Sequence, residues 1–441
     1  MQKINNIEIF VYALLGGIYI RFIGTLSISE IWVLLMSVFI PWRTLYKAYP
    51  FLSQVTGFYI VYLIIQIISE LLLANEFKNV SRGLMVTIVS FLTFIYLFNK
   101  FRSNTFIIVV FFFGLLVRSI IFRNASSMAG NVAYVSLVNF NEDVFKFRIA
   151  PILISFVLVV SYYLLKKELM LILMIVLLSV ATIFFLFDSR SLGMILFASS
   201  IYIVFAKSML KLKGSFLIVL LFFLIIGYTG YVIWTNGVLN RRIGGSHSYE
   251  QTIKMSNPYN PFELLLIGRG EFKVGLQALA DKPILGHGAW KKDLTGKYFR
   301  ILLSSSEKMD KELKRGIIEF KIKKGFVIPV HSVLIGAGVN NGIFAMLLMF
   351  FILMFFILKG IKVFSIIYNS PFSIIFFIQF VTLIWDSLFS PLPHFRLSMP
   401  ISFAIIFTFY TILKNYENYN WDSNLQQKRI FNQTFTRNKI L

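Results

Sequence analysis

The chain has 441 residues, of which 57% are hydrophobic and 14% are charged, and its formal net charge is +23. A soluble domain usually carries about 25% charged residues, so water cannot be the solvent for most of this surface. Cysteine is absent, which excludes a disulfide framework, a thiolate nucleophile and a cysteine-ligated metal. The composition predicts an all-α polytopic integral membrane protein with one large membrane domain.

Apolar runs recur along the whole chain. Crossing the hydrocarbon core takes roughly 20 helical residues, and the sequence contains about twelve runs of suitable length. The first run lacks a small-residue cleavage signature, so we expect a retained span rather than a removed signal peptide. The expected spans are 7–23, 28–42, 53–73, 83–98, 105–122, 149–165, 169–187, 191–206, 215–234, 338–358, 371–386 and 399–413.

The short loops between these runs indicate the orientation of the chain. Basic residues follow every even-numbered span. Examples are Arg43 and Lys47 after the second span, and Lys166 and Lys167 after the sixth. Lysine and arginine collect in cytoplasmic loops. We therefore predict that both termini are cytoplasmic, including a basic tail at 414–441.

One hydrophilic segment is far longer than the others and lies on the predicted outer side. It covers 235–330, between nine spans in 1–234 and three spans in 331–413, and it contains 17 basic and nine acidic residues. Long loops do not follow the positive-inside rule, so this charge does not alter the predicted orientation. A basic outer loop instead needs a functional explanation.

Two stretches of this outer loop are predicted to be helical. Between Pro261 and Pro283 the apolar residues recur at helical spacing, which is typical of an amphipathic helix on a membrane surface. The residues Gly286-His287-Gly288 predict a tight turn. The charged stretch 307–324 is expected to form a solvated helix.

Three residues on the outer side are candidates for chemistry. Arg190 lies at the outer end of the seventh span, Arg269 lies in the amphipathic stretch, and His331 closes the outer loop. Each has an ordinary interpretation, namely a snorkelling arginine paired with Asp188, a surface cation and a solvated histidine. Together they suit an anionic lipid-linked substrate, because arginine binds phosphate bidentately and fixed cations stabilise a leaving pyrophosphate.

Other kinds of site are not indicated. Residues 21–30 read RFIGTLSISE and contain no acidic pair for a divalent metal, and no His, Asp and Glu cluster has metal-ligand spacing. The chain has no P-loop, dinucleotide fingerprint or nucleophilic-serine elbow. We therefore expect a metal-independent reaction without a cofactor, and no nucleic-acid partner.

Three stretches resemble the O-antigen ligase and O-antigen polymerase superfamily of bacterial polysaccharide assembly. Their order, and their positions relative to the spans, resemble the family over roughly residues 185–350. The chain departs from the family pattern at Ser332, Asn340 and Ala345, where an Asn, an acid and a second Gly are common. The matching residues are Ser189-Arg190, then Arg269 with Phe272, Ala278-Leu279, Pro283, Gly286 and Gly288, and finally His331 with Gly342.

The resemblance implies glycosyl transfer on the outer face of a bacterial inner membrane, with a glycan on undecaprenyl pyrophosphate as the donor. His331 would accept the proton of the acceptor hydroxyl, while Arg190 and Arg269 would bind the leaving pyrophosphate. The implied partners are the lipid-linked glycan, membrane lipids and a chain-length regulator protein. Candidate glycan-binding residues, chosen by their place in the outer loop, are Arg241, Arg242, His287 and Lys291.

Several functions remain open. A polymerase transfers the glycan to another lipid-linked repeat unit, whereas a ligase transfers it to lipid A-core. The basic loop favours the polymerase, because its acceptor brings a second pyrophosphate. A lipid-linked oligosaccharide flippase would also have about twelve spans, but transporters of that kind usually show repeated halves, which this sequence lacks. A scaffold whose basic loop contacts anionic headgroups is a further alternative.

Overall fold

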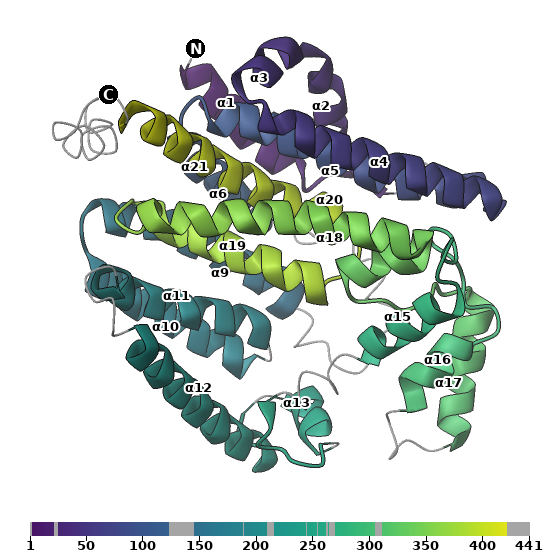
Figure 1. Ribbon diagram of the computed structural model, residues 1–441. Coiled ribbons are helices and arrows are strands. Elements are labelled where there is room, and N and C mark those ends of the chain that lie inside the picture. The colour runs from purple at the N-terminus through teal and green to yellow at the C-terminus, as the bar shows by residue number, and fades with distance from the viewer. Residues whose placement is uncertain are drawn as a thin grey trace.

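The computed structural model describes most of the chain as a bundle of helices (Figure 1). The described residues are 2–21, 25–122, 145–187, 189–209, 216–243, 245–253, 255–261, 263, 270–304 and 311–420. The expectation of an all-α architecture is confirmed, with one small β-hairpin in addition.

The helices of the first part of the chain are α1 (Gln2–Leu15), α2 (Ile28–Met36), α3 (Trp42–Ala48), α4 (Phe51–Leu72), α5 (Phe77–Phe101), α6 (Phe106–Ile121), α9 (Ala150–Lys166), α10 (Met170–Leu186), α11 (Arg190–Met209) and α12 (Phe216–Leu239). They are followed by α13 (Gly245–Thr252), α15 (Gly270–Asp281), α16 (Lys297–Ser304), α17 (Lys311–Lys324), α18 (Val333–Ile367), α19 (Ser373–Phe389), α20 (His394–Leu397) and α21 (Met399–Asn420). Two short helical turns lie at Ser37–Phe39 and Phe145–Ile149, and β1 (Tyr19–Arg21) pairs antiparallel with β2 (Thr25–Ser27).

Apolar helices identify a membrane-embedded protein. In the described part of the chain, three helices are long and apolar enough to cross a bilayer, at Phe51–Leu72, Phe77–Phe101 and Val333–Phe364. Shorter apolar helices at Phe106–Ile121, Ala150–Lys166 and elsewhere coincide with further expected spans. The total of about twelve spans stays a prediction.

Helix α4 has the inverted polarity of a membrane helix. Its buried face carries Gln66, Ser69 and Glu70, whereas isoleucines such as Ile60 and Ile64 are exposed. In a soluble helix the charged residues face the solvent and the apolar stripe faces the core. The exposed isoleucines therefore indicate contact with lipid, and the polar face turns toward the protein.

Two expected spans differ from the structure. The first, at 7–23, ends as a helix at Leu15, because Gly16-Gly17 follows and the chain turns into the β1–β2 hairpin. The second, at 28–42, is bent by 82° between Ile28–Phe39 and Trp42–Ala48. Pro41 lies at this bend, and proline ends a helix because it lacks the backbone N–H.

The outer loop folds against one end of the membrane helices. Val274 and Ala278 of α15, Tyr298 of α16 and Ile335 and Val339 of α18 form a small buried core. Figure 1 shows α15, α16 and α17 at the end of the bundle opposite α1 and the last turns of α21. The amphipathic helix expected at 261–283 is thus confirmed for its second half, α15, but it packs on α18. Leu276, expected on its apolar face, is exposed, because Val274 and Ala278 form the contact.

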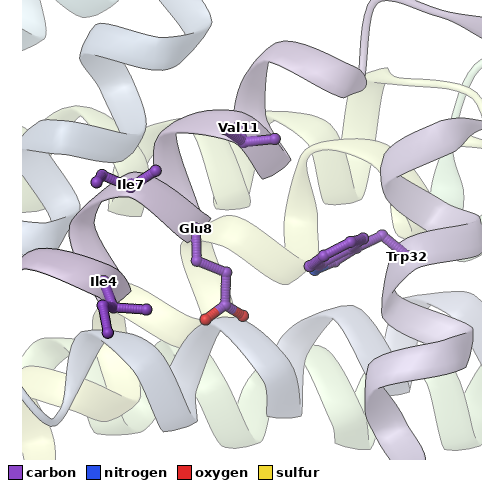
Figure 2. Close-up of a pocket in the computed structure, with 5 residues that line it drawn as sticks. All are labelled: Ile4, Ile7, Glu8, Val11 and Trp32. Carbon is purple, nitrogen blue, oxygen red and sulfur yellow. The ribbon is translucent and has the colours of Figure 1, made fainter. Parts of the chain in front are cut away.

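A shallow pocket of about 280 Å³ lies away from the outer loop, between α1 and α2 (Figure 2). Ile4, Ile7, Val11 and Trp32 give it an apolar wall, and Glu8 is its charged group. The Glu8 carboxylate pairs with Lys100 at 2.5 Å and accepts a hydrogen bond from Tyr96 at 2.8 Å. Since this charge is already compensated within the protein, the pocket offers no obvious polar chemistry.

Candidate active site: the outer loop at a broken helix

Helix α18 is interrupted near its start. Asn341 (φ −132°, ψ 15°) and Gly342 (φ 85°, ψ 178°) leave helical geometry, so the normal hydrogen-bond ladder is broken there. The outer-loop segment 283–289 supplies replacement partners: the Ile343 N–H donates to the Pro283 carbonyl at 2.7 Å, and the His287 N–H donates to the Val339 carbonyl at 2.7 Å. The break therefore stays hydrogen-bonded, as buried backbone must be.

Glycine is required where the loop meets the break. A Cβ at Gly342 would lie 1.8 Å from the carbonyl oxygen of Ile284, and one at Gly286 would lie 2.6 Å from the backbone of Asn340. Both residues also have positive φ, a region that L side chains rarely adopt. Gly286 and Gly342, which are part of the family resemblance, thus have a local physical role: they allow the backbones of the loop and of α18 to come into close contact.

The buried carboxylate of Glu70 joins this loop to α4. It accepts hydrogen bonds from the Ala289 N–H at 2.6 Å, the Asn341 side chain at 3.1 Å and the Asn75 side chain at 2.7 Å. The neighbouring Ser69 hydroxyl donates to the Leu285 carbonyl at 2.6 Å. Because charged hydrogen bonds are stronger than neutral ones, Glu70 is the principal polar anchor of the loop.

His287 is half-buried in the tight turn predicted from the sequence. Its Nε2 lies 2.9 Å from the Ala278 carbonyl and 3.1 Å from the Tyr298 hydroxyl. Burial lowers the pKa of the His287 imidazole, the hydrogen bond to Ala278 opposes that shift, and nearby Lys282 lowers the pKa further. A neutral imidazole donates from Nε2 to Ala278, so this histidine ties the turn to α15. Its predicted part in glycan binding stays a prediction.

His331 lies immediately before α18, where Ser332 begins the helix. The Ser332 hydroxyl accepts a hydrogen bond from the Ile335 N–H at 3.2 Å, which is the usual role of an N-cap serine. The His331 side chain is 47% exposed, and its Nδ1 lies 4.0 Å from Oε1 of Glu271. A carboxylate beside the Nδ1 of a histidine can orient the imidazole ring, which is an arrangement suited to a general base.

Arg190 begins α11 and lies among residues of α12 and α13. Its guanidinium is 5.3 Å from the Trp234 ring, and its Nη2 donates to the Gln251 side chain at 2.5 Å. The indole Nε1 of Trp234 is buried without a hydrogen-bond partner in the part of the chain that the structure describes. A guanidinium held over an aromatic ring by a side-chain amide can bind an oxyanion.

The remaining predicted residues divide into two groups. Arg241 has positive φ and lies 4.4 Å from the Tyr249 ring, near the Arg190 contacts on α12 and α13, while Arg242 is exposed beside it. Lys291 is exposed in the outer loop, and its carbonyl accepts a hydrogen bond from the Ile328 N–H at 3.0 Å. Arg269 lies outside the described residues, as does Asp188, the partner considered for Arg190.

These contacts fall into two groups. One contains Arg190, Trp234 and Gln251, and the other contains His331 and Glu271 at the start of α15 and α18. Described residues of the second stretch, such as Phe272 and Ala278 of α15, pack on α18, so this stretch meets the third one, with His331, at one end of the bundle.

Two acidic residues were missed by the sequence analysis. Glu70 stood in an apolar run, and a charge inside a span is a functional candidate by default, so this signal was available. Glu271 carried no such signal, because an acid in a charged loop is ordinary. Only the packing of α15 on α18 brings it beside His331.

No protein-family model matches this chain, and no curated protein matches its sequence significantly.

Proposed function

We propose that this protein is a membrane glycosyltransferase that polymerises undecaprenyl-pyrophosphate-linked repeat units into O-antigen or capsular polysaccharide. In this proposal about twelve spans cross a bacterial plasma membrane, both termini are cytoplasmic, and the outer loop is periplasmic. The observation that carries the proposal is the meeting of His331 with Glu271 at the loop-bound start of α18, because it gives the histidine a carboxylate neighbour.

The proposed reaction uses groups already present in the chain. The acceptor hydroxyl loses its proton to His331 as its oxygen attacks the anomeric carbon of the donor. The bond from that carbon to the pyrophosphate oxygen breaks, and the electron pair leaves with the pyrophosphate. Arg190, with Arg269, stabilises the negative charge that develops on the leaving group. The sugar–phosphate bond supplies the driving force, so we expect neither a nucleotide nor a metal to be needed.

The geometry around Arg190 supports its role as an anion ligand. The Trp234 ring 5.3 Å away and the hydrogen bond to Gln251 hold the guanidinium in place. A preorganised cation stabilises developing charge without reorganising during the reaction, which is where electrostatic catalysis gains most. Arg241, in the turn that follows α12, and Tyr249 of α13 provide a second cation–aromatic pair, suited to binding a sugar phosphate.

A flippase remains the alternative from another class, because transporters also use broken helices near their substrates. In such transporters the unwound backbone is left available to the substrate or ion. Here the freed groups of α18 are bonded by the loop, as the Ile343–Pro283 and His287–Val339 hydrogen bonds indicate. This favours a fixed outer platform for a reaction over alternating access.

A genetic experiment separates the candidate functions. Lipopolysaccharide or capsule from a deletion strain is compared by gel with strains complemented by wild type, Arg269→Ala or His331→Ala. Core bearing one repeat unit, uncorrected by either variant, indicates the polymerase. Bare core with polymer accumulating on the carrier lipid indicates the ligase, which also uses this chemistry. Bare core without polymer on the carrier lipid would favour the flippase, and normal banding after deletion would favour the scaffold; either result would contradict the proposal.

A further inference from the structure

A second cationic group lies under the β1–β2 hairpin, apart from the outer loop. We call it the Arg118 cluster and define it as Tyr12 of α1, Ser29 and Glu30 of α2, Thr93 of α5, Arg118 of α6 and Arg396 of α20. None of these residues takes part in the proposed transfer reaction.

The guanidinium of Arg118 is packed tightly inside the protein. A Cβ at Gly16 would lie 2.6 Å from its Nη1, and one at Gly17 would lie 3.0 Å from its Cγ. These two glycines therefore make room for the arginine at the end of α1. Ser29 completes this wall, because its hydroxyl oxygen lies 3.2 Å from the same Gly16 Cβ position.

Arg118 lacks the partner that a buried cation needs. Its Nε is buried without a hydrogen bond, and no ion pair to Arg118 is found among the described residues. An unpaired charge removed from water costs several kcal/mol, so such a group is normally bonded, hydrated or bound to a ligand. The cost of burying this charge implies that a ligand or water binds to the cluster in the membrane.

Three further buried polar atoms in the cluster have no hydrogen-bond partner. They are Oε1 of Glu30, Oγ1 of Thr93 and Nε of Arg396. Glu30 Oε1 and Arg396 Nε are 2.8 Å apart and form an ion pair, but their geometry is not that of a hydrogen bond. Tyr12 interacts with Thr93, Glu30 and Arg118, and Arg396 joins the cluster through its ion pair with Glu30.

The charges of the cluster select an anion. Two arginines and one glutamate leave one positive charge uncompensated, and Glu30 is already paired with Arg396. A guanidinium presents a planar set of N–H donors that matches phosphate oxygens bidentately. Beyond Arg118 on α6, Ile120 and Ile121 are exposed, so the end of α6 that carries the arginine presents apolar side chains to lipid.

We propose that the Arg118 cluster binds the phosphate group of a lipid at the membrane boundary. Two sources share this chemistry: the headgroup of an anionic bilayer phospholipid and the pyrophosphate of a polyprenyl carrier. Binding at this cluster is independent of the proposed glycosyl transfer, because it requires no reaction. Lipid binding and transfer activity can therefore fail separately.

The test is native mass spectrometry of the full-length protein purified in detergent. Wild type, Arg118→Met and Arg118→Lys are titrated with phosphatidylglycerol, with undecaprenyl pyrophosphate, or with uncharged diacylglycerol. Arg43→Met is the matched control, because Arg43 is an exposed arginine on α3, away from the cluster. Size-exclusion profiles and unfolding temperatures establish that each variant is folded.

Wild type and Arg43→Met are expected to bind phosphatidylglycerol or undecaprenyl pyrophosphate at the Arg118 cluster, and no diacylglycerol. Because the proposed active site also binds undecaprenyl pyrophosphate, only the difference between wild type and Arg118→Met is assigned to the cluster. Arg118→Met is expected to bind the phosphate-bearing lipid about tenfold more weakly or worse, since a charge-assisted hydrogen bond is lost, and Arg118→Lys should lie between them. Loss of phosphatidylglycerol alone identifies the bilayer lipid, and loss of undecaprenyl pyrophosphate alone identifies the carrier. Equal retention of both lipids by wild type and Arg118→Met would overturn the proposal, as would a higher unfolding temperature for Arg118→Met with lipid present.

Discussion

The carboxylate of Glu70 accepts a hydrogen bond from the Asn341 side chain at 3.1 Å, which links α4 to the break in α18. The same oxygen accepts the Ala289 N–H of the outer loop at 2.6 Å. A membrane helix, a broken helix and the outer loop thus meet at one buried acid. The position of the loop, and with it α15 and its neighbours, depends on this junction.

Removing the Glu70 carboxylate should release the loop. In Glu70→Ala the buried Ala289 N–H loses its acceptor, which costs about 1–3 kcal/mol. Glu70→Gln should cost less, because it keeps one acceptor oxygen and only its new NH₂ opposes the Asn75 amide. Trypsin cleavage after Lys291 and Lys292 measures the release. Glu76→Ala, at an exposed acid beyond the same helix, should be cleaved at the wild-type rate. If Glu70→Ala is as well protected from trypsin as wild type, Glu70 does not anchor the loop.

Gly342→Ala should disturb the same junction by sterics alone. Its Cβ would lie 1.8 Å from the Ile284 oxygen at φ 85°, ψ 178°, a conformation that is essentially restricted to glycine. We expect a loss of at least about 2 kcal/mol, read as a lower unfolding temperature. Gly57→Ala on α4 is the control, because a Cβ there meets nothing within 4 Å. If Gly342→Ala unfolds at the same temperature as Gly57→Ala, the contact between Gly342 and Ile284 is not as close as described.

Acid should loosen the loop through His287. Its pKa is lowered mainly by burial, so the unfolded loop binds the proton more readily than the docked loop does. The stability that the neutral imidazole contributes is therefore present above the ordinary pKa of 6.5 and is lost as the pH falls below it. The pKa of Asp281 is lowered chiefly by the hydrogen bond from Lys297. Its contribution to stability is also lost in acid, but only as the pH falls below the ordinary pKa of 3.8.

The measurement is trypsin sensitivity of the loop between pH 7.5 and 5.5, for wild type and His287→Asn. Wild type should become more sensitive as the pH falls, whereas the variant, which cannot be protonated at this position, should be sensitive to the same extent throughout. A pH response of equal size in both proteins would mean that another group is responsible.

Arg190 should not tolerate its closest chemical substitute. Lysine keeps the charge but loses the planar stack over Trp234 and the fork of donors. We expect Arg190→Lys to reduce transfer by about tenfold or more, since losing one transition-state donor commonly costs as much. Arg43→Lys, at an exposed arginine on α3, is the comparison. Wild-type rates for Arg190→Lys would remove this arginine from the mechanism.

The helices were largely predictable from the sequence because apolar runs of the required length leave few alternatives. The helix expected at 307–324 is confirmed over Lys311–Lys324, as α17. The turn expected at Gly286–Gly288 is confirmed by the positive φ of both glycines. The break in α18 was not predicted. Asn341 and Gly342 are compatible with a membrane helix, and only the contact with residues 283–289, far away in the chain, stabilises the interruption.

The candidate site was predictable in kind but not in arrangement. Charged residues at the ends of spans drew attention to Arg190 and His331, because charge near a bilayer is costly. Which residues lie beside Arg190 and His331 depends on how the helices pack against one another. The spacing of residues along the sequence does not show that packing. Trp234 and Gln251 therefore appear beside Arg190, and Glu271 beside His331, only in the folded protein.

The most direct test is transfer by the purified protein in liposomes, supplied with one synthetic repeat unit on undecaprenyl pyrophosphate. The proposed mechanism predicts a ladder of longer lipid-linked glycans with release of undecaprenyl pyrophosphate, unaffected by EDTA. His331→Ala should slow ladder formation by about 10²–10⁴-fold, the usual contribution of a general base. A wild-type protein that binds the lipid-linked unit and never extends it, or a His331→Ala protein that extends it at the wild-type rate, would contradict the mechanism.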